Sequence, residues 1–357
     1  METGSFVFSK RSTASHNAVW KAPSNIALVK YWGKHGAQLP KNPSISFTLS
    51  KCATTTEVSF FPKKVDENPT FEFYFEKKEQ PDFHPKINQF LQRIIPYFIG
   101  LKDYHLKISS HNSFPHSSGI ASSASAMAAL SLCIMDFEKQ INDELTDEDF
   151  FKKASFLARL GSGSAARSLK GPLTLWGQSP SFSNSSDLYA VPLGPDIHSI
   201  FKTYCDTILI VDRGKKKVSS SVGHKLMQDH PFAAKRFEQA HQNCEALKAV
   251  LVNGDLEQFI EITESEALSL HAMMMTSSPR YILMQPDTLN VINKVWDFRA
   301  ETGLPLSFTL DAGANVHLLY PEAYREKVIA YVKSDLVSHC ESGQFIEDQV
   351  GEGAKKI

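Results

Sequence analysis

The chain has 357 residues, of which 42% are apolar and 22% are charged, and its formal net charge is −1. This composition is typical of a globular protein with two domains or one large one. A net charge near zero gives no basic field for nucleic acid. No apolar run reaches the roughly 18 to 20 residues of a membrane span, so we expect neither nucleic-acid nor membrane binding.

Cysteine usage and the first residues bear on the compartment. The five cysteines stand far apart without CxxC spacing, which favours reduced thiols in a cytosol over a disulfide framework. Residues 1–16 are polar and lack the apolar core of a signal peptide. We therefore expect a cytoplasmic protein with a loosely ordered beginning.

In the first half of the chain, alternation at period two predicts strands at residues 55–61 and 70–76, joined as a hairpin. Thr146 opens a capping-box pattern, which predicts a helix that ends at Gly161. Apolar patterns predict further elements at residues 106–110 (strand), 122–137 (helix) and 173–176 (strand).

The second half mixes helices and strands in the same way. Apolar residues at helical spacing predict two helices, which a turn at Gly254 separates. Asp311 is the first residue of the predicted link between two strands. The expected helices cover residues 232–251, 256–273 and 289–300, and the expected strands cover 207–211, 305–310 and 316–320. Intermixed elements indicate an α+β chain. A Ser-, Pro- and Gly-rich stretch at 179–197 suggests two domains, residues 1–190 and 191–357.

Four segments carry candidate chemistry, and the first is APSNIALVKYWGK at residues 22–34. Lys30 and Lys34 stand four residues apart around two aromatic rings and a glycine. An ammonium in such a place can meet a phosphate or carboxylate as a point charge. The alternative is a pair of lysines at a strand end that keep their charges in water.

The second segment, HNSFPHSSGIASSASA, lies at residues 111–126 directly before an apolar helical pattern. Small residues allow a ligand to approach the backbone. The start of a helix offers unpaired N–H groups and a positive dipole end. This arrangement predicts an anion site, most plausibly for phosphate; the alternative is a Ser/Ala-rich turn before an ordinary helix.

The other two segments each contribute one charged side chain. GSGSAARSLKG at residues 161–171 carries Arg167, whose guanidinium can hold a carboxylate with two hydrogen bonds, unless it is a solvated loop arginine. FTLDAGANVHLL carries Asp311 at the end of an apolar strand. A desolvated carboxylate there can accept a proton from an alcohol, whereas the plainer interpretation is an Asx turn.

Together these segments resemble the GHMP small-molecule kinase superfamily and, within it, the diphosphomevalonate decarboxylases. APSNIALVKYWGK, PSISFTLS, SFPHSSGIASSASA, GSGSAARS and DAGAN occur in the family's order, so the resemblance runs from Ala22 to at least Tyr320. It implies a two-lobed α+β fold of the GHMP-kinase type, with the active-site cleft between an N-terminal ATP-binding domain and a C-terminal domain.

The resemblance also implies a reaction. The family uses ATP, normally with Mg²⁺, to phosphorylate the 3-hydroxyl of mevalonate 5-diphosphate; loss of phosphate and CO₂ then gives isopentenyl diphosphate. Asp311 would be the catalytic carboxylate, Lys30 would stand beside it, and Arg167 would bind the substrate carboxylate. The remaining substrate-binding residues would be Asn25, Tyr31, Lys34, Ser162, Ser164 and Ser220.

For ATP, the resemblance implies that the loop and helix start wrap the phosphates, with the Ser123 hydroxyl at Mg²⁺. The phosphate-binding residues would be Ser118, Gly119, Ala121, Ser122, Ser123 and Ala124. His116 stands where many members have a small residue, and we expect it to pack beneath the loop. A homodimer is compatible with the family pattern.

Two features leave alternatives open. Ser221 stands where some bacterial members carry an arginine for the diphosphate, so that contact would come from elsewhere, with Arg213 and residues 215–217 as candidates. The rival functions are a phosphomevalonate decarboxylase, a mevalonate or phosphomevalonate kinase, and a non-catalytic nucleotide-binding protein. Because Asp311 and Lys30 are intact and accompany Arg167, decarboxylation is favoured.

Overall fold

The computed structural model describes residues 3–64, 69–115, 120–214, 218 and 220–357, with the side chains of Ser220 and Ser221 left out. The strands are β1 (His16–Ala27), β2 (Lys34–His35), β3 (Leu39–Pro40), β4 (Ser44–Pro62), β5 (Thr70–Phe75), β6 (Lys78–Glu79), β7 (Tyr104–Asn112), β8 (Leu173–Trp176), β9 (Val191–Pro192), β10 (Cys205–Leu209), β11 (Ser307–Thr309), β12 (Val316–Tyr320), β13 (Phe345–Gln349) and β14 (Lys355–Lys356).

Eight α-helices accompany these strands in the described part of the chain: α1 (His84–Ile94), α2 (Ser122–Ile141), α3 (Asp147–Gly161), α4 (Ser220–Leu226), α5 (Ala233–Asn253), α6 (Leu256–Thr276), α7 (Pro286–Thr302) and α8 (Arg325–Tyr331). Mixed helices and strands confirm the predicted α+β class. Among the described helices, none has the length and apolar character needed to cross a bilayer.

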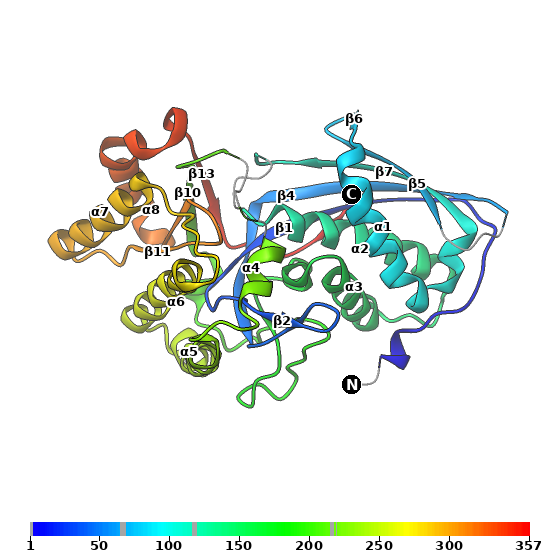
Figure 1. Ribbon diagram of the computed structural model, residues 1–357, viewed down its shortest axis with the longest axis horizontal. Helices are drawn as coiled ribbons and strands as arrows, with labels where there is room; N and C mark the ends of the chain where they lie inside the picture. The colour runs from blue at the N-terminus through cyan, green and yellow to red at the C-terminus, as the bar shows by residue number, and fades with distance from the viewer. Residues whose placement is uncertain (1–2, 65–68, 116–119, 215–217, 219) are drawn as a thin grey trace.

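The larger sheet belongs mainly to the first half of the chain. Its strands run in the order β14-β1-β4-β7-β5-β6, and β8 pairs with β4 and β9. Helix α2 packs on β1 and β4, and α3 packs on α2, so the helices cover one face of this sheet (Figure 1). The layer between them is apolar and rich in aromatic rings, which makes it a rigid base for the segments at its edge.

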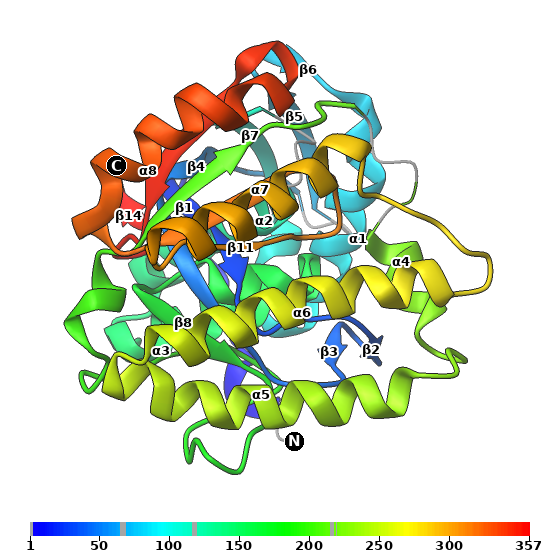
Figure 2. The same cartoon turned by 90° about the vertical axis from the view of Figure 1, so that its left-hand side faces the viewer.

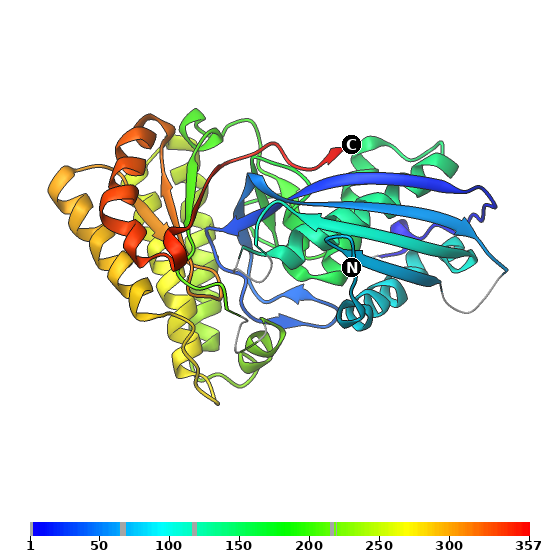
Figure 3. The same cartoon turned by 90° about the horizontal axis from the view of Figure 1, so that it is seen from above.

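The smaller sheet, in the order β11-β12-β10-β13, belongs to the second half. Helices α6 and α7 contact β11, and α5 contacts α6. These three long helices lie side by side in Figure 2. Figure 3 shows the two groups of elements next to one another, with the C-terminal segment running back to the larger sheet.

That returning segment ties the two sheets together. β14 pairs with β1, with Trp20 opposite Lys356. Asp348 at the end of β13 accepts the main-chain N–H groups of Ser50, Lys51 and Cys52 at 3.1, 2.8 and 2.7 Å. Three amide donors offset the desolvation of this buried carboxylate, so the bend in β4 is attached to the smaller sheet.

Local sequence signals placed several elements correctly. The Thr146 hydroxyl accepts the N–H of Asp149, which confirms the predicted cap of α3. Gly254, with a φ of 74°, ends α5 at the predicted turn between two helices. The two strands predicted on either side of Asp311 are β11 and β12, and they pair antiparallel.

Two expectations were wrong. Strands β4 and β5 do not form a hairpin, because β7 lies between them, antiparallel to β4 and parallel to β5. Residues near the beginning are not loose throughout: Phe6 is buried and its ring stacks on Phe156 at 4.4 Å. Both errors have the same origin, because the partners that these segments contact, β7 and Phe156, lie far away in sequence.

The pair Lys153–Glu138 joins α3 to α2 inside the core and gives a stability prediction. Lys153 Nζ donates to both Glu138 oxygens at 2.7 and 2.6 Å and to the Tyr97 carbonyl at 3.0 Å. Lys153→Met leaves a buried carboxylate without its partner and should lower the free energy of unfolding by about 3–5 kcal/mol. Urea denaturation measures this change.

Replacement of both groups by apolar residues, Lys153→Met with Glu138→Leu, should recover most of the loss, because no charge then remains buried. Lys139→Met is the matched control, since its partner Asp147 lies at the surface of the same helix pair. Equal losses for Lys153→Met and Lys139→Met would show that the buried pair has no special weight.

Candidate active site

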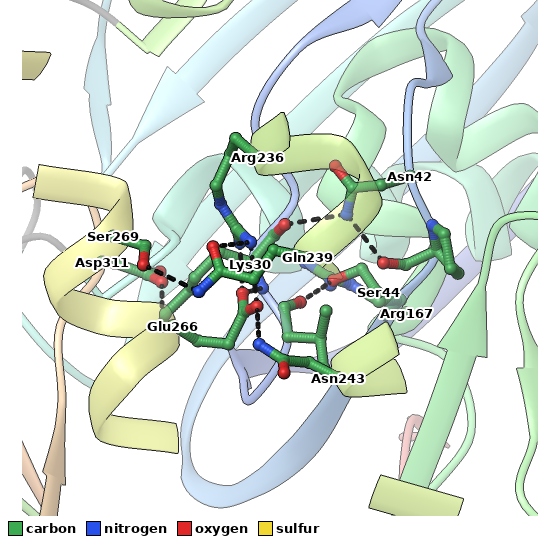
Figure 4. A network of polar contacts seen from close by, with 12 residues as sticks. Lys30, Asn42, Ser44, Arg167, Arg236, Gln239, Asn243, Glu266, Ser269 and Asp311 are labelled. Carbon is green, nitrogen blue, oxygen red and sulfur yellow. Dashed lines mark hydrogen bonds and ion pairs between the residues drawn. The ribbon is translucent and has the colours of Figure 1, made fainter. Parts of the chain in front are cut away.

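The site begins where β1 leaves the larger sheet. The main chain of Lys30 is held on both sides: its N–H donates to Glu266 Oε2 at 2.8 Å, and its carbonyl accepts Asn42 Nδ2 at 3.0 Å. Asn42 Nδ2 also donates to the Pro43 carbonyl at 2.7 Å. Figure 4 shows these contacts around Lys30. The backbone at Lys30 is therefore fixed between two parts of the chain.

Glu266 lies on the buried face of α6 and is completely enclosed. Arg236 of α5 donates to both of its oxygens, and Asn243 Nδ2 donates to Oε1 at 2.7 Å. A buried carboxylate costs free energy unless its lone pairs are filled, and here four donors, including the Lys30 N–H, fill them. Arg236, Asn243 and Glu266 form a network that positions Lys30 (Figure 4).

The Lys30 side chain meets Asp311 across the two sheets. Nζ and Oδ1 are 3.2 Å apart, and the side chains are 2% and 26% exposed. Burial lowers the pKa of Lys30, while the charge of Asp311 and their hydrogen bond act in the opposite direction. The Asp311 side chain is 26% exposed and lines the cavity, so a ligand there can reach it.

The main chain of Asp311 is fixed too. His271 Nε2 lies 3.1 Å from the Asp311 carbonyl oxygen and donates to it, because a carbonyl only accepts. The Gly313 N–H donates to the same oxygen at 2.7 Å. The turn after β11 therefore presents the carboxylate in one orientation.

Arg167 lies at the end of a short 3₁₀ turn, Gly163–Arg167, and is 3% exposed. Its Nη1 donates to the Ser44 hydroxyl, and its Nε has no hydrogen-bond partner among the described residues. Burial lowers the pKa of Arg167 to about 10, which leaves it charged at neutral pH. A buried guanidinium with an unfilled donor is suited to an anionic ligand.

Tyr31 packs on the same turn. A Cβ added at Gly163 would lie 2.7 Å from Tyr31 Oη, so only glycine fits at that position. Tyr31 Oη is buried without a hydrogen-bond partner among the described residues. Asn25 donates to the Ser164 carbonyl and the Ser168 hydroxyl at 3.2 and 2.7 Å, and so holds the turn from behind.

Helix α2 begins against this turn. Ala121 precedes the helix in the left-handed region with a φ of 44°, and Ser123 Oγ lies 3.2 Å from Ser162 Oγ. Ala124 is buried under the helix start. His116, Ser118 and Gly119 lie outside the described residues.

These groups share one cavity of about 580 Å³. Ten of the site residues named from the sequence line it: Lys30, Tyr31, Lys34, Ala121, Ser122, Ser123, Ser162, Ser164, Arg167 and Asp311. Asn25 and Ala124 are not among the lining residues. Aromatic and aliphatic side chains line it as well, namely Phe73, Phe75, Phe83, Ile87, Ile108, Met127 and Leu130. The cavity thus combines charged groups with an apolar wall.

Lys34 adds positive charge to this cavity. Its Nζ donates to Gln38 Oε1 at 2.7 Å. Burial lowers the pKa of Lys34, and the positive charges of Arg93 and Lys225 lower it further. A group of cations kept close together favours a ligand with several negative charges. Ser220 belongs to α4, and residues 215–217 lie outside the described part of the chain.

Sequence reasoning missed the residues that support the site, above all Glu266, Arg236 and His271. A signal for Glu266 was present: it lies four residues after Ile262 and four before Leu270, on the buried face of α6. An acid within an apolar helical stripe needs partners. Nothing local indicates that one of those partners is the Lys30 N–H, 236 residues away.

Comparison with known proteins gives a consistent result. Residues 22–189 match the family model described as diphosphomevalonate decarboxylase-like N-terminal domain. Residues 207–356 match the model described as mevalonate 5-diphosphate decarboxylase C-terminal domain. The diphosphomevalonate decarboxylase of Candida albicans is 31% identical over 88% of this chain and 87% of its own length. That of Aspergillus fumigatus is 30% identical over 90% and 81%.

A phosphomevalonate decarboxylase of Haloferax volcanii is 28% identical over 87% of this chain and 90% of its own length. Among solved structures, MDDEF in complex with MVAPP, AMPPCP and magnesium superposes with a TM-score of 0.82 at 27% identity, covering 96% of this chain and 99% of that one. Mevalonate diphosphate decarboxylase from Staphylococcus aureus gives the same TM-score at 29% identity, covering 96% and 98%.

These structural matches confirm the expected GHMP-kinase-type fold over nearly the whole chain. The relatives at 30% identity and above cover most of their own length, and the two family models follow one another in order along the sequence. The chain therefore belongs to the diphosphomevalonate decarboxylase family.

Proposed function

We propose that this protein catalyses the ATP-dependent decarboxylation of mevalonate 5-diphosphate to isopentenyl diphosphate, with ADP, phosphate and CO₂ as the other products. The observation that carries the proposal is the meeting of Lys30, Arg167 and Asp311 in one cavity with the serine-lined start of α2. A carboxylate, two cations and a phosphate-binding helix start are the groups that phosphoryl transfer followed by decarboxylation requires.

In the first step, Asp311 accepts the proton of the substrate 3-hydroxyl while that oxygen attacks the γ-phosphorus of ATP. Lys30, 3.2 Å from Asp311, keeps the carboxylate ionised and in place. The O–P bond to ADP breaks and a 3-phosphate forms. Most of the acceleration comes from alignment and charge, because phosphoryl transfer needs little covalent help.

In the second step, the C–O bond to the new phosphate breaks and the carboxylate leaves as CO₂. The electrons of the breaking C–C bond form the double bond of the product. Arg167 holds the carboxylate in the orientation that aligns these bonds, with Ser162 and Ser164 beside it on the same turn. Asn25 supports that turn through the Ser164 carbonyl.

For the 5-diphosphate we propose Tyr31, Lys34 and Ser220, with Lys225 of α4 supplying the positive charge that Ser221 lacks. The unfilled, buried Tyr31 hydroxyl and the cations around Lys34 support this assignment. Positive charge predominates in the cavity, because Asp311 is the acidic residue among its described lining residues, whereas Lys30, Lys34, Lys86 and Arg167 also line it.

For ATP we propose the segment around the start of α2, with Ser118, Gly119, Ala121, Ser122, Ser123 and Ala124 at the phosphates and the apolar wall at Phe73, Phe75 and Phe83 for adenine. Among the described residues no cluster of three or more His, Cys, Asp or Glu side chains could hold a metal alone. The Ser123 hydroxyl would therefore hold Mg²⁺ together with the phosphate oxygens of ATP. The ion would neutralise phosphate charge there.

We extend the proposal to organisation. The proposed domains are residues 1–190 and 191–357, and this division is supported by the two family models, the first of which ends at 189 and the second of which begins at 207. A cytoplasmic location is supported by the five cysteines, which are all buried and unpaired. A homodimer remains part of the proposal from the family pattern.

The second candidate is a phosphomevalonate decarboxylase, which the similarity to the Haloferax volcanii protein favours. The two activities share Asp311, Lys30 and Arg167 and differ only at the 5-phosphate end. The concentration of positive charge around Lys34 favours the diphosphate.

Incubation of the protein with ATP, Mg²⁺ and mevalonate 5-diphosphate should release ADP and CO₂ in equal amounts. The monophosphate is the matched control and should react at least tenfold less efficiently in kcat/KM. ADP release with a stable phosphorylated product and no CO₂ would instead identify a kinase. A preference for the monophosphate would establish the second candidate.

Asp311→Asn keeps the shape of the side chain and removes its charge and basicity. Turnover should fall by roughly 10²–10⁴-fold, while ATP binding and the folded structure persist. Steady-state kinetics and circular dichroism check both parts, with exposed Asp335→Asn as the control. Addition of Lys30→Met should be far from additive, because the two groups act as a pair. If turnover stayed within a few-fold of the wild-type value, Asp311 would have no catalytic role and would only close a turn.

Arg167→Lys replaces a planar fork with a point charge and should weaken transition-state stabilisation by roughly 1.5–3 kcal/mol, as loss of charged hydrogen bonds does. The change is measured as kcat/KM for the substrate, and ATP affinity should stay nearly constant. Arg280→Lys, at an exposed arginine, is the control. Unaltered kinetics of Arg167→Lys would remove this residue from the site.

A further inference from the structure

His224 of α4 occupies a place that the mechanism has not used. Its imidazole lies between two rings of the active-site segment, with ring centroids 4.3 Å from Tyr31 and 4.7 Å from Trp32. Its Nδ1 lies 2.9 Å from the Gly33 nitrogen and accepts that N–H. His224 is buried and lines the same cavity as Tyr31 and Lys34.

The hydrogen bond determines the state of the imidazole. A main-chain N–H can only donate, so Nδ1 carries a lone pair and the ring proton is on Nε2. Burial lowers the pKa of His224 to about 3, and the positive charge of Lys34 acts in the same direction. The ring is therefore neutral at physiological pH and remains an acceptor for Gly33.

The surroundings of this hydrogen bond leave little room for another arrangement. Gly33 has a φ of 101°, and a Cβ added there would lie 2.7 Å from Phe237 Cζ of α5. A Cβ added at Gly223 would lie 2.4 Å from Trp32 Cζ2. The turn at residues 31–34 therefore packs against both α4 and α5. His224 provides the hydrogen bond that joins α4 to this turn.

We propose that His224 is a positioning residue for the diphosphate of the substrate: by accepting the Gly33 N–H it fixes the turn that presents the Tyr31 hydroxyl and the Lys34 ammonium to the cavity. Gly33 lies between Trp32 and Lys34 in sequence, two residues after Tyr31, so a rotation of its peptide would move both Tyr31 and Lys34. This inference rests on the proposed role of Tyr31 and Lys34 at the diphosphate.

Two substitutions separate the two nitrogens of the ring. His224→Asn places an amide oxygen near the position of Nδ1 and keeps an acceptor for Gly33, whereas His224→Gln extends its polar group toward the position of Nε2. For Gln, KM for mevalonate 5-diphosphate should rise roughly five- to tenfold, with kcat within twofold, as expected when one hydrogen bond that supports ground-state binding is lost. For Asn, KM should stay within about twofold of the wild-type value.

His35→Asn is the matched control, because His35 is exposed one residue after Lys34, and its kinetics should not change. The monophosphate sharpens the test: His224→Gln should reduce the preference for the diphosphate over the monophosphate, which a merely destabilised protein would keep. Equal KM values for the Asn and Gln variants, or a larger loss for Asn, would overturn the proposal, since Nδ1 would then not be the acting atom.

A measurement on the wild-type protein covers the case in which the variants fail to fold. Long-range ¹H–¹⁵N spectra should show His224 as the neutral Nε2–H form at pH 7, with the Gly33 amide protected from hydrogen exchange. A protonated ring or the Nδ1–H form would reject the inference. Failure of the wild-type enzyme to release CO₂ would instead reject the proposed function, so the two failures are distinguishable.

Discussion

The carboxylate of Glu266 is the interaction on which the site depends. It lies fully buried on α6, in the second half of the chain, and it binds the main-chain N–H of Lys30, in the first half. A bare charge there would be prohibitively costly, so Arg236 and Asn243 complete its coordination. The same carboxylate pairs with Arg236 and accepts the Lys30 N–H. Loss of Glu266 would therefore both destabilise the core and displace the catalytic lysine.

The three charged groups at the centre carry an imbalance that prepares the cavity for its ligands. Lys30 and Arg167 are both buried, and burial lowers the pKa of each, while Asp311 provides the opposing charge nearby. Two cations facing one carboxylate leave an excess of positive charge. A substrate with a carboxylate and a diphosphate removes that excess, so the free energy spent on burying the cations is recovered on binding. Arg167 Nε and Tyr31 Oη are buried without a hydrogen-bond partner among the described residues, and a bound anionic substrate would supply one.

The sequence could predict what is encoded locally. The Thr146 cap, the helix end at Gly254 and the strand end at Asp311 each depend on a few neighbouring residues, and all three occur as expected. The position of β5 could not be predicted in this way, because β7 separates it from β4 through long-range pairing. Motifs named ten of the residues that line the cavity, but not His224 in that lining or Glu266 behind it, whose roles arise only when distant segments meet.

Those long-range contacts converge on the short segment from Lys30 to Gly33. Glu266 of α6 holds its first N–H, Phe237 of α5 fills the space beside Gly33, and His224 of α4 accepts the Gly33 N–H. Every one of these supports comes from the second half of the chain, although the segment itself leaves β1. The two halves that meet near residue 190 thus contribute mainly to different sheets. The active site, in contrast, needs residues from both halves. Separation of the halves would take the Lys30 N–H away from Glu266 and the His224 acceptor away from the Gly33 N–H, so the active site exists only in the joined chain.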